Sequence, residues 1–224
     1  KNVARDQYRN PYETLSFFEI EKEMIVVELS PGGGWYTEIL ANYIHSPGKL
    51  IAAHFDRDSK RDFYIRMRNN FEDKINKNPM YKDVSVVDLS SKLADPGSID
   101  AVLTFRNLHN WIGPQIDIIF ANSHKALKKG GVLGIVEHRA DPGTSLEEMK
   151  KTGYVTEEYA IETAKKHGFM LVAKSEINAN PKDTKNYTRG VWTLPPVLRL
   201  KEQDKETYLD IGESDRMTLL FRKL

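Results

Sequence analysis

The most informative segment of the sequence is Met24-Ile25-Val26-Val27-Glu28-Leu29-Ser30-Pro31-Gly32-Gly33-Gly34-Trp35-Tyr36-Thr37, an apolar run that ends in a carboxylate and leads into three glycines. Its β-branched residues predict a buried parallel strand, and glycine lets the main chain turn tightly and contact a ligand. The helix expected after the turn would direct its free N–H groups at that ligand. We therefore expect this segment to bind a molecule that carries a ribose or a phosphate.

The spacing of the glycines separates three kinds of site. Dinucleotide-binding folds require Gly-x-Gly-x-x-Gly, but Thr37 occupies the position of the last glycine, and the Gly-Lys-Ser/Thr ending of a P-loop is absent. A third pattern, acidic-x-Gly-x-Gly-x-Gly, places an acidic residue at the end of the strand, four positions before the second glycine. Glu28, Gly32 and Gly34 match this pattern, and Ser30 stands in place of its first glycine. The alternative is a strand-to-helix turn with no ligand.

The third pattern resembles motif I of the class I S-adenosylmethionine-dependent methyltransferases, in which the turn passes under the methionine end of the cofactor. The resemblance implies that S-adenosylmethionine is the cofactor of this chain. The residues expected to bind it at the turn are Glu28, Ser30, Pro31, Gly32, Gly33 and Gly34.

Length and composition narrow the class of protein. The 224 residues suit one α/β domain with a full hydrophobic core. With 33 Lys and Arg against 32 Asp and Glu, the net charge is +1, which provides no overall field to attract nucleic acid or anionic lipid. The absence of cysteine excludes disulfides, thiolate catalysis, iron–sulfur clusters and zinc–thiolate sites. We expect no metal site and no nucleic-acid partner, and the oligomeric state stays open.

The location of the protein is left open by the sequence. It contains no secretory signal and no apolar run long enough to cross a bilayer, so we expect no membrane partner. The chain begins at Lys1 rather than at a methionine, so we expect an upstream segment to have been removed or left out. A cytoplasmic location is favoured because the pool of S-adenosylmethionine is cytosolic, and export is the alternative.

Predicted strands and helices alternate along most of the chain. Strands are expected at residues 25–27, 49–55, 84–87, 99–105, 132–136, 169–175 and 217–221, and helices at 11–18, 36–43, 60–76, 114–127 and 156–167. Such alternation requires parallel strands with right-handed crossovers, which predicts a doubly wound, mostly parallel, seven-stranded Rossmann-like α/β sheet. We expect one domain, made of an arm and helix (1–23), a cofactor-binding core (24–177), an irregular acceptor-side insertion (178–213) and the last strand (214–224).

Carboxylates follow two of the predicted strands, at the edge where open α/β sheets bind ligands. Asp56 comes after the second strand, about twenty residues past the glycine turn, where a carboxylate can accept hydrogen bonds from both ribose hydroxyls. Asp88 comes after the third strand and is a candidate for the adenine side. Capping of the next helix or turn is the alternative for both residues.

A second block begins after the fourth predicted strand with Arg106-Asn107-Leu108-His109-Asn110-Trp111. With the later turn Leu127-Lys128-Lys129-Gly130-Gly131, it resembles the late half of class I methyltransferases. Within it, His109-Asn110-Trp111 resembles the His-Asp-Trp element of small-molecule O-methyltransferases, whose histidine takes the proton from the substrate hydroxyl. Asn110 departs from that element and removes a charge that could tune the histidine. In the alternative, His109 binds a backbone carbonyl and Trp111 belongs to the core.

Segments spread over nearly the whole chain resemble a bacterial family of predicted methyltransferases. These segments are residues 10–15, 31–37, 104–111, 136–140 and 175–184. The resemblance implies a class I fold and a cofactor site, and it names no acceptor. The polar and aromatic residues of the predicted insertion suit a small polar molecule, and a rigid surface excursion is the alternative.

We therefore expect a methyltransferase that acts on a small-molecule acceptor, through O-methylation with His109 as the base. Beyond the glycine turn, the expected cofactor-binding residues are Asp56, Asp88, Arg106 and Asn107, and the expected acceptor-binding residues are Asn110, Trp111, His138, Arg139, Asn180, Lys182 and Trp192. A structural ion pair is the alternative for Arg139. A non-catalytic protein that binds S-adenosylmethionine is the alternative function. Thr37 and the Leu-Lys-x-Gly-Gly turn weigh against a nicotinamide-dependent oxidoreductase.

Overall fold

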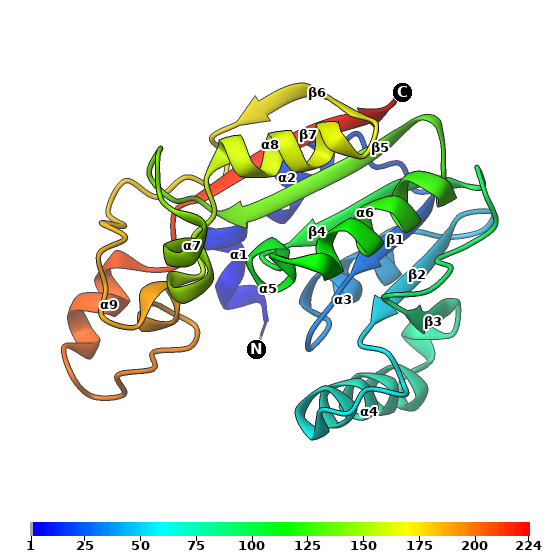
Figure 1. Cartoon of the computed structure of the whole chain (residues 1–224). Coiled ribbons are helices and arrows are strands. Elements are labelled where there is room, and N and C mark those ends of the chain that lie inside the picture. Colours follow the sequence, from blue (N-terminus) through cyan, green and yellow to red (C-terminus); the bar gives the residue numbers. More distant parts are fainter. Residues whose placement is uncertain (1) are drawn as a thin grey trace.

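Within residues 2–224, the part of the chain that this computed structural model describes, the strands form one seven-stranded sheet in the order β3-β2-β1-β4-β5-β7-β6 (Figure 1). They are β1 (Ile25–Leu29), β2 (Lys49–His54), β3 (Val84–Asp88), β4 (Ile99–Phe105), β5 (Leu127–His138), β6 (Phe169–Ser175) and β7 (Arg216–Lys223). Strands β1 to β5 pair in parallel, whereas β7 runs antiparallel to β5 and β6. The predicted doubly wound, mostly parallel sheet is confirmed.

Helices cover both faces of this sheet because consecutive residues of a strand point to opposite sides. Val27 and Val102 pack with the helices α6 (Pro114–Ala126) and α8 (Glu157–Lys166), whereas Val26 and Leu103 pack on the opposite face with α2 (Pro11–Phe17) and α3 (Trp35–Tyr43). The helical elements are η1 (Val3–Arg5), α1 (Asp6–Arg9), α2 (Pro11–Phe17), α3 (Trp35–Tyr43), α4 (Asp62–Lys77), η2 (Pro79–Tyr81), α5 (Leu108–Trp111), α6 (Pro114–Ala126), α7 (Leu146–Thr152), α8 (Glu157–Lys166), η3 (Gly190–Thr193) and α9 (Lys205–Ile211).

The structure differs from the predicted elements mainly in its short helices. The insertion predicted to be irregular contains η3 and α9, the arm contains η1 and α1, and α5 and α7 follow strands. Lys1, the first residue of the predicted arm, lies outside the described residues. β5 begins at Leu127 rather than at residue 132, because Leu127 already pairs with Ile99 ahead of a bulge. Elements of one or two turns are too short to show a period, and tertiary contacts stabilise them.

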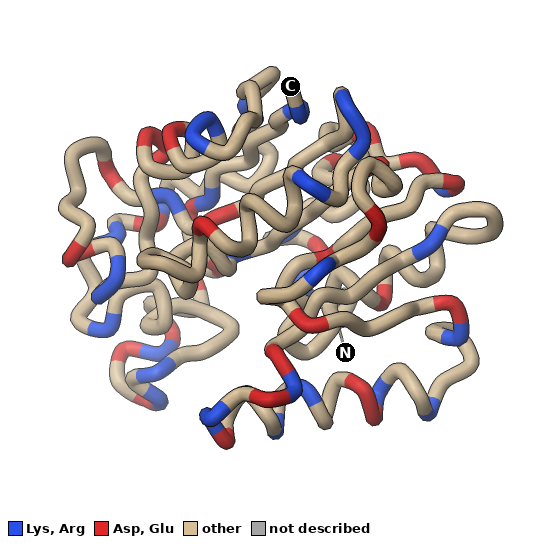
Figure 2. The backbone as a smooth tube through the Cα atoms, turned by 45° about the vertical axis from the view of Figure 1, so that its right-hand side comes forward, with Lys and Arg blue, Asp and Glu red and all other residues tan. Residues whose placement is uncertain are grey.

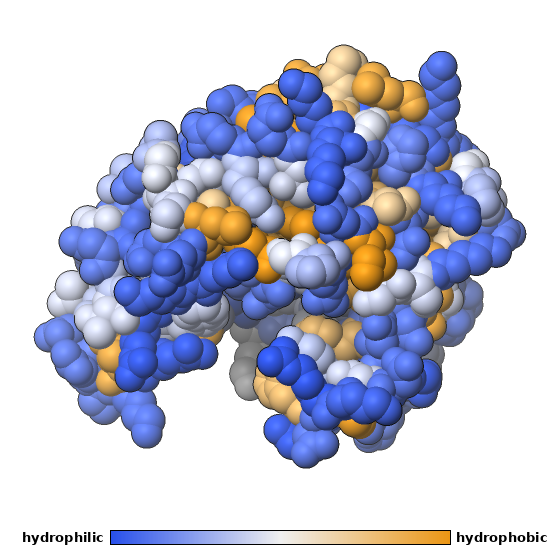
Figure 3. All heavy atoms as spheres, in the orientation of Figure 1, coloured by the Kyte–Doolittle hydropathy of each residue, from blue (hydrophilic) through white to orange (hydrophobic). Residues whose placement is uncertain are grey.

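The carboxyl ends of β1 and β4 lie side by side, and the strand order reverses between them. Open α/β sheets bind ligands at such a switch point. The space-filling view shows a hollow in the surface between the regions of α4 and α9 (Figure 3).

Basic and acidic residues are interspersed along the chain (Figure 2), in keeping with its small net charge. Among residues 2–224, no helix is both long enough and apolar enough to span a membrane.

Candidate cofactor and acceptor site

Two adjoining cavities lie at the carboxyl edge of the sheet. The arm-side cavity, of about 610 Å³, is lined by the N-terminal arm, the glycine turn, α5, η3 and the residues before β7. The α4-side cavity, of about 580 Å³, lies between the turn, α4 and α5. Both volumes are typical of sites for metabolite-sized ligands. The residues common to both cavities are Ser30, Gly32, Met67, Asn107 and Asn110.

The glycine turn leaves its main chain open to these cavities. A Cβ atom added to Gly32 or Gly33 would meet no atom within 4 Å, so a ligand can approach both peptides closely. Gly34 is required for a different reason, since its Cβ would lie 3.0 Å from the Phe71 ring of α4 and its φ is +75°. The turn therefore leaves the peptides of Gly32 and Gly33 accessible to a ligand, whereas Gly34 lets the start of α3 pack closely on α4.

Ser30 takes the left-handed backbone conformation, with φ of 50°, at the position where the motif has its first glycine. This conformation costs an ordinary residue about 1–2 kcal/mol. The Ser30 Oγ atom is buried without a hydrogen-bond partner among the described residues. Because Ser30 lines both cavities, its unsatisfied hydroxyl marks a position for a polar group of a ligand.

Glu28 lies beneath the turn, buried at the end of β1. Its carboxylate accepts a hydrogen bond of 2.6 Å from Thr37 Oγ1 in the first turn of α3. Burial raises the pKa of Glu28 to about 7, and Thr37, Lys74 and Arg106 oppose the rise. Glu28 is not among the described residues that line either cavity, so it supports the turn from below.

The predicted ribose and adenine carboxylates make structural contacts. Asp56 Oδ1 accepts a hydrogen bond of 2.9 Å from the backbone N–H of Ser90. Asp88 forms an ion pair of 3.1 Å with the buried Arg68 of α4. Neither carboxylate is among the described residues that line the two cavities.

Aromatic side chains line the α4-side cavity instead. Phe55, directly after β2, stacks on Tyr64 of α4 with ring centroids 4.0 Å apart. Trp111 and Met67 also line this cavity, and Asn110 lies at the boundary with the other one. Aromatic rings and a thioether give this cavity an apolar wall, against which a planar heterocycle can pack. Sequence patterns missed Phe55 and Tyr64, because aromatic residues at such positions ordinarily belong to the core.

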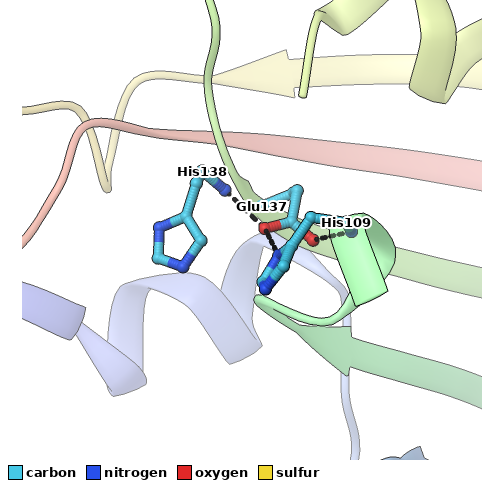
Figure 4. A group of neighbouring side chains, drawn as sticks. All are labelled: His109, Glu137 and His138. Carbon is cyan, nitrogen blue, oxygen red and sulfur yellow. Dashed lines mark hydrogen bonds and ion pairs between the residues drawn. The ribbon is translucent and has the colours of Figure 1, made fainter. Parts of the chain in front are cut away.

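His109, whose side chain is 6% exposed, pairs with the fully buried Glu137 (Figure 4), and His109 lines the arm-side cavity. His109 Nδ1 lies 3.1 Å from Glu137 Oε1, and the backbone N–H of His109 donates to Oε2 at 3.3 Å. With its Nδ1–H bonded to the carboxylate, the imidazole presents Nε2 as a proton acceptor. In the His-Asp-Trp element the aspartate follows the histidine directly, but here Asn110 carries no charge. The carboxylate beside His109 is instead that of Glu137, near the end of β5, which pairs in parallel with β4. Glu137 was not predicted as a site residue.

His138 lies beside His109, with ring centroids 5.4 Å apart, and lines the same cavity. Its Nδ1 atom lies 2.5 Å from Ser214 Oγ. Burial, helped by His109, Arg106 and Arg216, holds the pKa of His138 well below its ordinary value. His138 is therefore neutral at physiological pH and offers a hydrogen bond rather than a charge.

The group His109, Glu137 and His138 also has atoms within 4.8 Å of one another that could bind a metal ion. Glu137 already accepts three hydrogen bonds, from the ring and backbone of His109 and from the backbone of His138. Arg106 lines the same cavity and would repel a divalent cation. These hydrogen bonds and the nearby guanidinium disfavour a metal ion at this group.

Arg106 and Asn107 connect the end of β4 to the turn after β1. Asn107 Nδ2 donates to the carbonyl oxygens of Leu29 and Ser30, each at 3.2 Å. Arg106, like Ser30, has a left-handed backbone, with φ of 62°. Burial lowers the pKa of Arg106 to about 10, so the guanidinium is still charged at neutral pH. Both residues line the arm-side cavity.

The predicted acceptor residues divide into two groups. Trp192 lines the arm-side cavity, and its ring centroid lies 5.9 Å from that of His109. Arg139 lies outside the cavities and forms ion pairs of 2.7–3.2 Å with carboxylates of α8, of the segment after β6 and of the segment before β7. Asn180 donates to the carbonyl of Ile211, the last residue of α9, and to that of Glu213, and Lys182 pairs with Asp210. Asn180 and Lys182 thus brace the insertion, and Arg139 joins elements on either side of it.

The arm-side cavity also contains charged residues that sequence patterns did not assign. Arg5 and Arg9 reach it from the arm, and Glu213 reaches it from the segment before β7. A spacing of four residues places Arg5 and Arg9 on one helical face, which is the one local signal that could have indicated them.

Solved structures show which fold this is, although no family model and no curated protein matches the sequence. A methyltransferase from Aquifex aeolicus that depends on S-adenosylmethionine is 15% identical, with a TM-score of 0.66 over 99% of this chain and 93% of that one. Geranyl diphosphate C-methyltransferase from Streptomyces coelicolor A3(2) is 10% identical, with a TM-score of 0.67 over 99% and 82%. The 4+2 cyclase SpnF is 14% identical, with a TM-score of 0.68 over 96% and 80%. The chain has the fold of class I methyltransferases.

Proposed function

We propose that this chain is an S-adenosylmethionine-dependent methyltransferase that methylates a hydroxyl of a small molecule, with His109 as the base. The observation that carries the proposal is the pair of His109 and Glu137, whose histidine lines a cavity beside the glycine turn of a class I methyltransferase fold. The fold predicts the cofactor, and the pair indicates a reaction that removes a proton.

The residues around the turn fit S-adenosylmethionine. Gly32 and Gly33 leave an open cradle, and the unsatisfied Ser30 hydroxyl offers a hydrogen bond. Phe55 and Tyr64 give the α4-side cavity an aromatic wall against which the adenine ring can pack. The methionine end would then lie toward the arm-side cavity, which places the acceptor beside His109.

The protein's own part in the reaction follows from these positions. When bound, the cofactor supplies a methyl group already activated by its sulfonium. His109 Nε2 accepts the proton of the acceptor hydroxyl, while Glu137 keeps the imidazole in the required tautomer and stabilises the imidazolium that forms. Trp192 and the prolines at 195 and 196 add apolar surface to the wall of this cavity.

A protein of this fold that binds the cofactor without transferring its methyl group is the second candidate. SpnF, which bears the name of another activity, resembles this chain as well as the methyltransferases do. The two candidates differ in one measurement, because only the first would move a labelled methyl group to an acceptor.

Cofactor binding is tested first by thermal unfolding with S-adenosylhomocysteine or NAD. At one hundred times its Kd, S-adenosylhomocysteine should stabilise the protein by about 2.7 kcal/mol and raise Tm by several degrees, whereas NAD should not. Gly33→Val is the control, because its side chain enters the cradle without meeting protein atoms within 4 Å of its Cβ. This variant should fold normally and lose the shift. No shift for the wild type at millimolar ligand would overturn the proposal.

The base is tested by replacing each member of the pair. His109→Ala should lower kcat by about 10²–10⁴-fold for an acceptor found by labelled methyl transfer, with binding of S-adenosylhomocysteine preserved. Glu137→Gln should lower kcat less and shift the pH profile, since the amide does not stabilise the imidazolium. His45→Ala, a change on an exposed loop, should leave turnover unchanged. An unchanged pH dependence in His109→Ala would contradict the assignment.

A further inference from the structure

Four arginines surround one buried carboxylate at the wall of the arm-side cavity. Glu213 Oε1 lies 2.9 Å from Arg5 Nε, and Glu213 Oε2 lies 3.0 Å from Arg9 Nε. Arg216 Nη1 and Arg106 Nη1 lie 3.2 Å and 3.8 Å from the same Oε2. One negative charge faces four positive ones, so the cluster is strongly cationic.

Part of this cationic cluster faces the cavity with unused donors. Arg5, Arg9 and Arg106 line the cavity, whereas Arg216 is held by backbone carbonyls. Arg9 is 2% exposed, and its Nη1 has no hydrogen-bond partner among the described residues. Arg106 reaches Glu213 only at 3.8 Å, beyond hydrogen-bond distance. Buried guanidinium donors without partners are unfavourable unless a ligand accepts their hydrogen bonds.

The proposed cofactor brings no net negative charge to this cluster. Its methionyl carboxylate arrives with an ammonium and a sulfonium, so the whole molecule adds positive charge. The other carboxylates nearby are engaged: Glu137 accepts from His109, and the burial of Glu28 disfavours its ionised form. The acceptor is the remaining source of negative charge in the cavity.

We infer that the acceptor carries a carboxylate or phosphate group, bound by Arg5, Arg9 and Arg106, and that its hydroxyl faces His109. This inference rests on the proposed function. Arginine is well suited to the role, because its planar guanidinium binds both oxygens of such a group. Arg106 and His109 belong to the same segment after β4 and line the same cavity, so one small acceptor can contact both.

The test is calorimetric titration of the protein saturated with S-adenosylhomocysteine, using inorganic phosphate and succinate at constant ionic strength. We expect at least one of these anions to bind, and putrescine, a dication, not to bind. Arg5→Met and Arg106→Met should each weaken anion binding by about tenfold or more. Arg66→Met is the matched control, because Arg66 is exposed on α4 and is not among the described residues lining either cavity, and its anion affinity should equal that of the wild type.

The outcomes separate the possible sources of the anion. Failure of both anions to bind, or equal binding to wild type and Arg106→Met, would overturn the inference. If the arginine variants lose affinity for S-adenosylhomocysteine but keep that for methylthioadenosine and the anions, the cluster holds the cofactor's carboxylate and the inference is wrong. Arg5→Met decides the matter if Arg106→Met does not fold.

Failure of the proposed function would look different. In that case S-adenosylhomocysteine would not bind to the wild type at all. Titration of phosphate into the free protein would then show whether an anion site that depends on Arg106 exists. If no such site were found, this inference would be overturned as well.

Discussion

At the scale of single residues, two residues of the site have strained backbone conformations that the surrounding fold maintains. Ser30 and Arg106 both have left-handed backbones, and each directly follows a central strand. Such conformations persist only where the surrounding structure holds them, and they gather at binding sites. Here Asn107 holds the Ser30 peptide, and the backbone N–H of Arg106 donates to Val136 at 2.7 Å. The left-handed conformation therefore sets the direction from which Ser30 and Arg106 reach the cavity.

Glu28 makes the stability of the protein depend on pH. Its pKa is raised from 4.5 to about 7 in the folded state, so between these values the folded protein keeps a proton that the unfolded chain has released. The stabilisation is complete below pH 4.5 and is lost as the pH rises through 7, by about 3 kcal/mol in all. Glu28→Gln keeps a partner for Thr37 without titrating, so this part of the slope should disappear.

The measurement is urea unfolding of wild type and Glu28→Gln at pH 5 and pH 8. We expect the variant to gain stability relative to the wild type at the higher pH, because the wild type must then bury a charge. Glu158→Gln, a change on the outer part of α8, should follow the wild type. Parallel pH profiles for wild type and Glu28→Gln would show that burial does not raise the pKa of Glu28.

At the scale of elements, short helices complete the cavity. The 3₁₀ turn η3 carries Val191 and Trp192 into the arm-side cavity. Its position depends on Gly190, whose φ is 53° and whose added Cβ would lie 2.1 Å from the carbonyl oxygen of Thr152 at the end of α7. Gly153 also packs on Trp192, with its added Cβ 3.2 Å from the indole. Close contact between α7 and η3 thus sets the position of the Trp192 ring.

Gly190→Ala should destabilise the protein by more than about 2 kcal/mol, because the methyl group clashes with backbone and the left-handed conformation is strained. Gly97→Ala is the matched control. Gly97 also has a left-handed backbone, with φ of 64°, but its Cβ would meet nothing within 4 Å, so only about 1 kcal/mol should be lost. Chemical denaturation of both variants measures the difference, and equal losses would show that α7 and η3 can move apart.

At the scale of the whole molecule, the two ends of the chain build one wall of the site. Arg5 and Arg9 near the N-terminus bond Glu213, which lies more than two hundred residues later. Arg216 of β7 also bonds the backbone carbonyl of Tyr8 in α1. The arm is therefore held against the last strand by charged contacts, and the arm-side cavity forms only when both ends are in place.

Glu213→Gln tests this closure. Removing the charge leaves buried Arg9 and Arg216 without compensation, which should cost about 3–5 kcal/mol. Asp95→Asn, which breaks an exposed ion pair with Lys92, should leave stability unchanged. Thermal and urea unfolding would check both, and a loss in Glu213→Gln no larger than in the control would show that the arm does not depend on this carboxylate.

The fold was predictable because its signals are local. Alternating apolar strands and amphipathic helices identified the sheet, and the turn from Pro31 to Gly34 identified the strand beside the switch point. The short helices were missed, since a single turn has no period. The contacts of Asp56 with Ser90 and of Asp88 with Arg68 were not predictable, because a strand-end position does not specify a side chain's partner, and the expected contacts of both carboxylates with the cofactor stay a prediction.

By itself, the sequence determined the doubly wound sheet and the place of the glycine turn, because propensity and periodicity act within a few neighbouring residues. Only the tertiary structure joined His109 to Glu137 across β4 and β5, and Arg5 and Arg9 to Glu213 across the whole chain. These contacts follow from strand order and from the return of the C-terminal segment beside the arm. A pairing between distant charges has no local signature, so its partners emerge only once packing has brought them together.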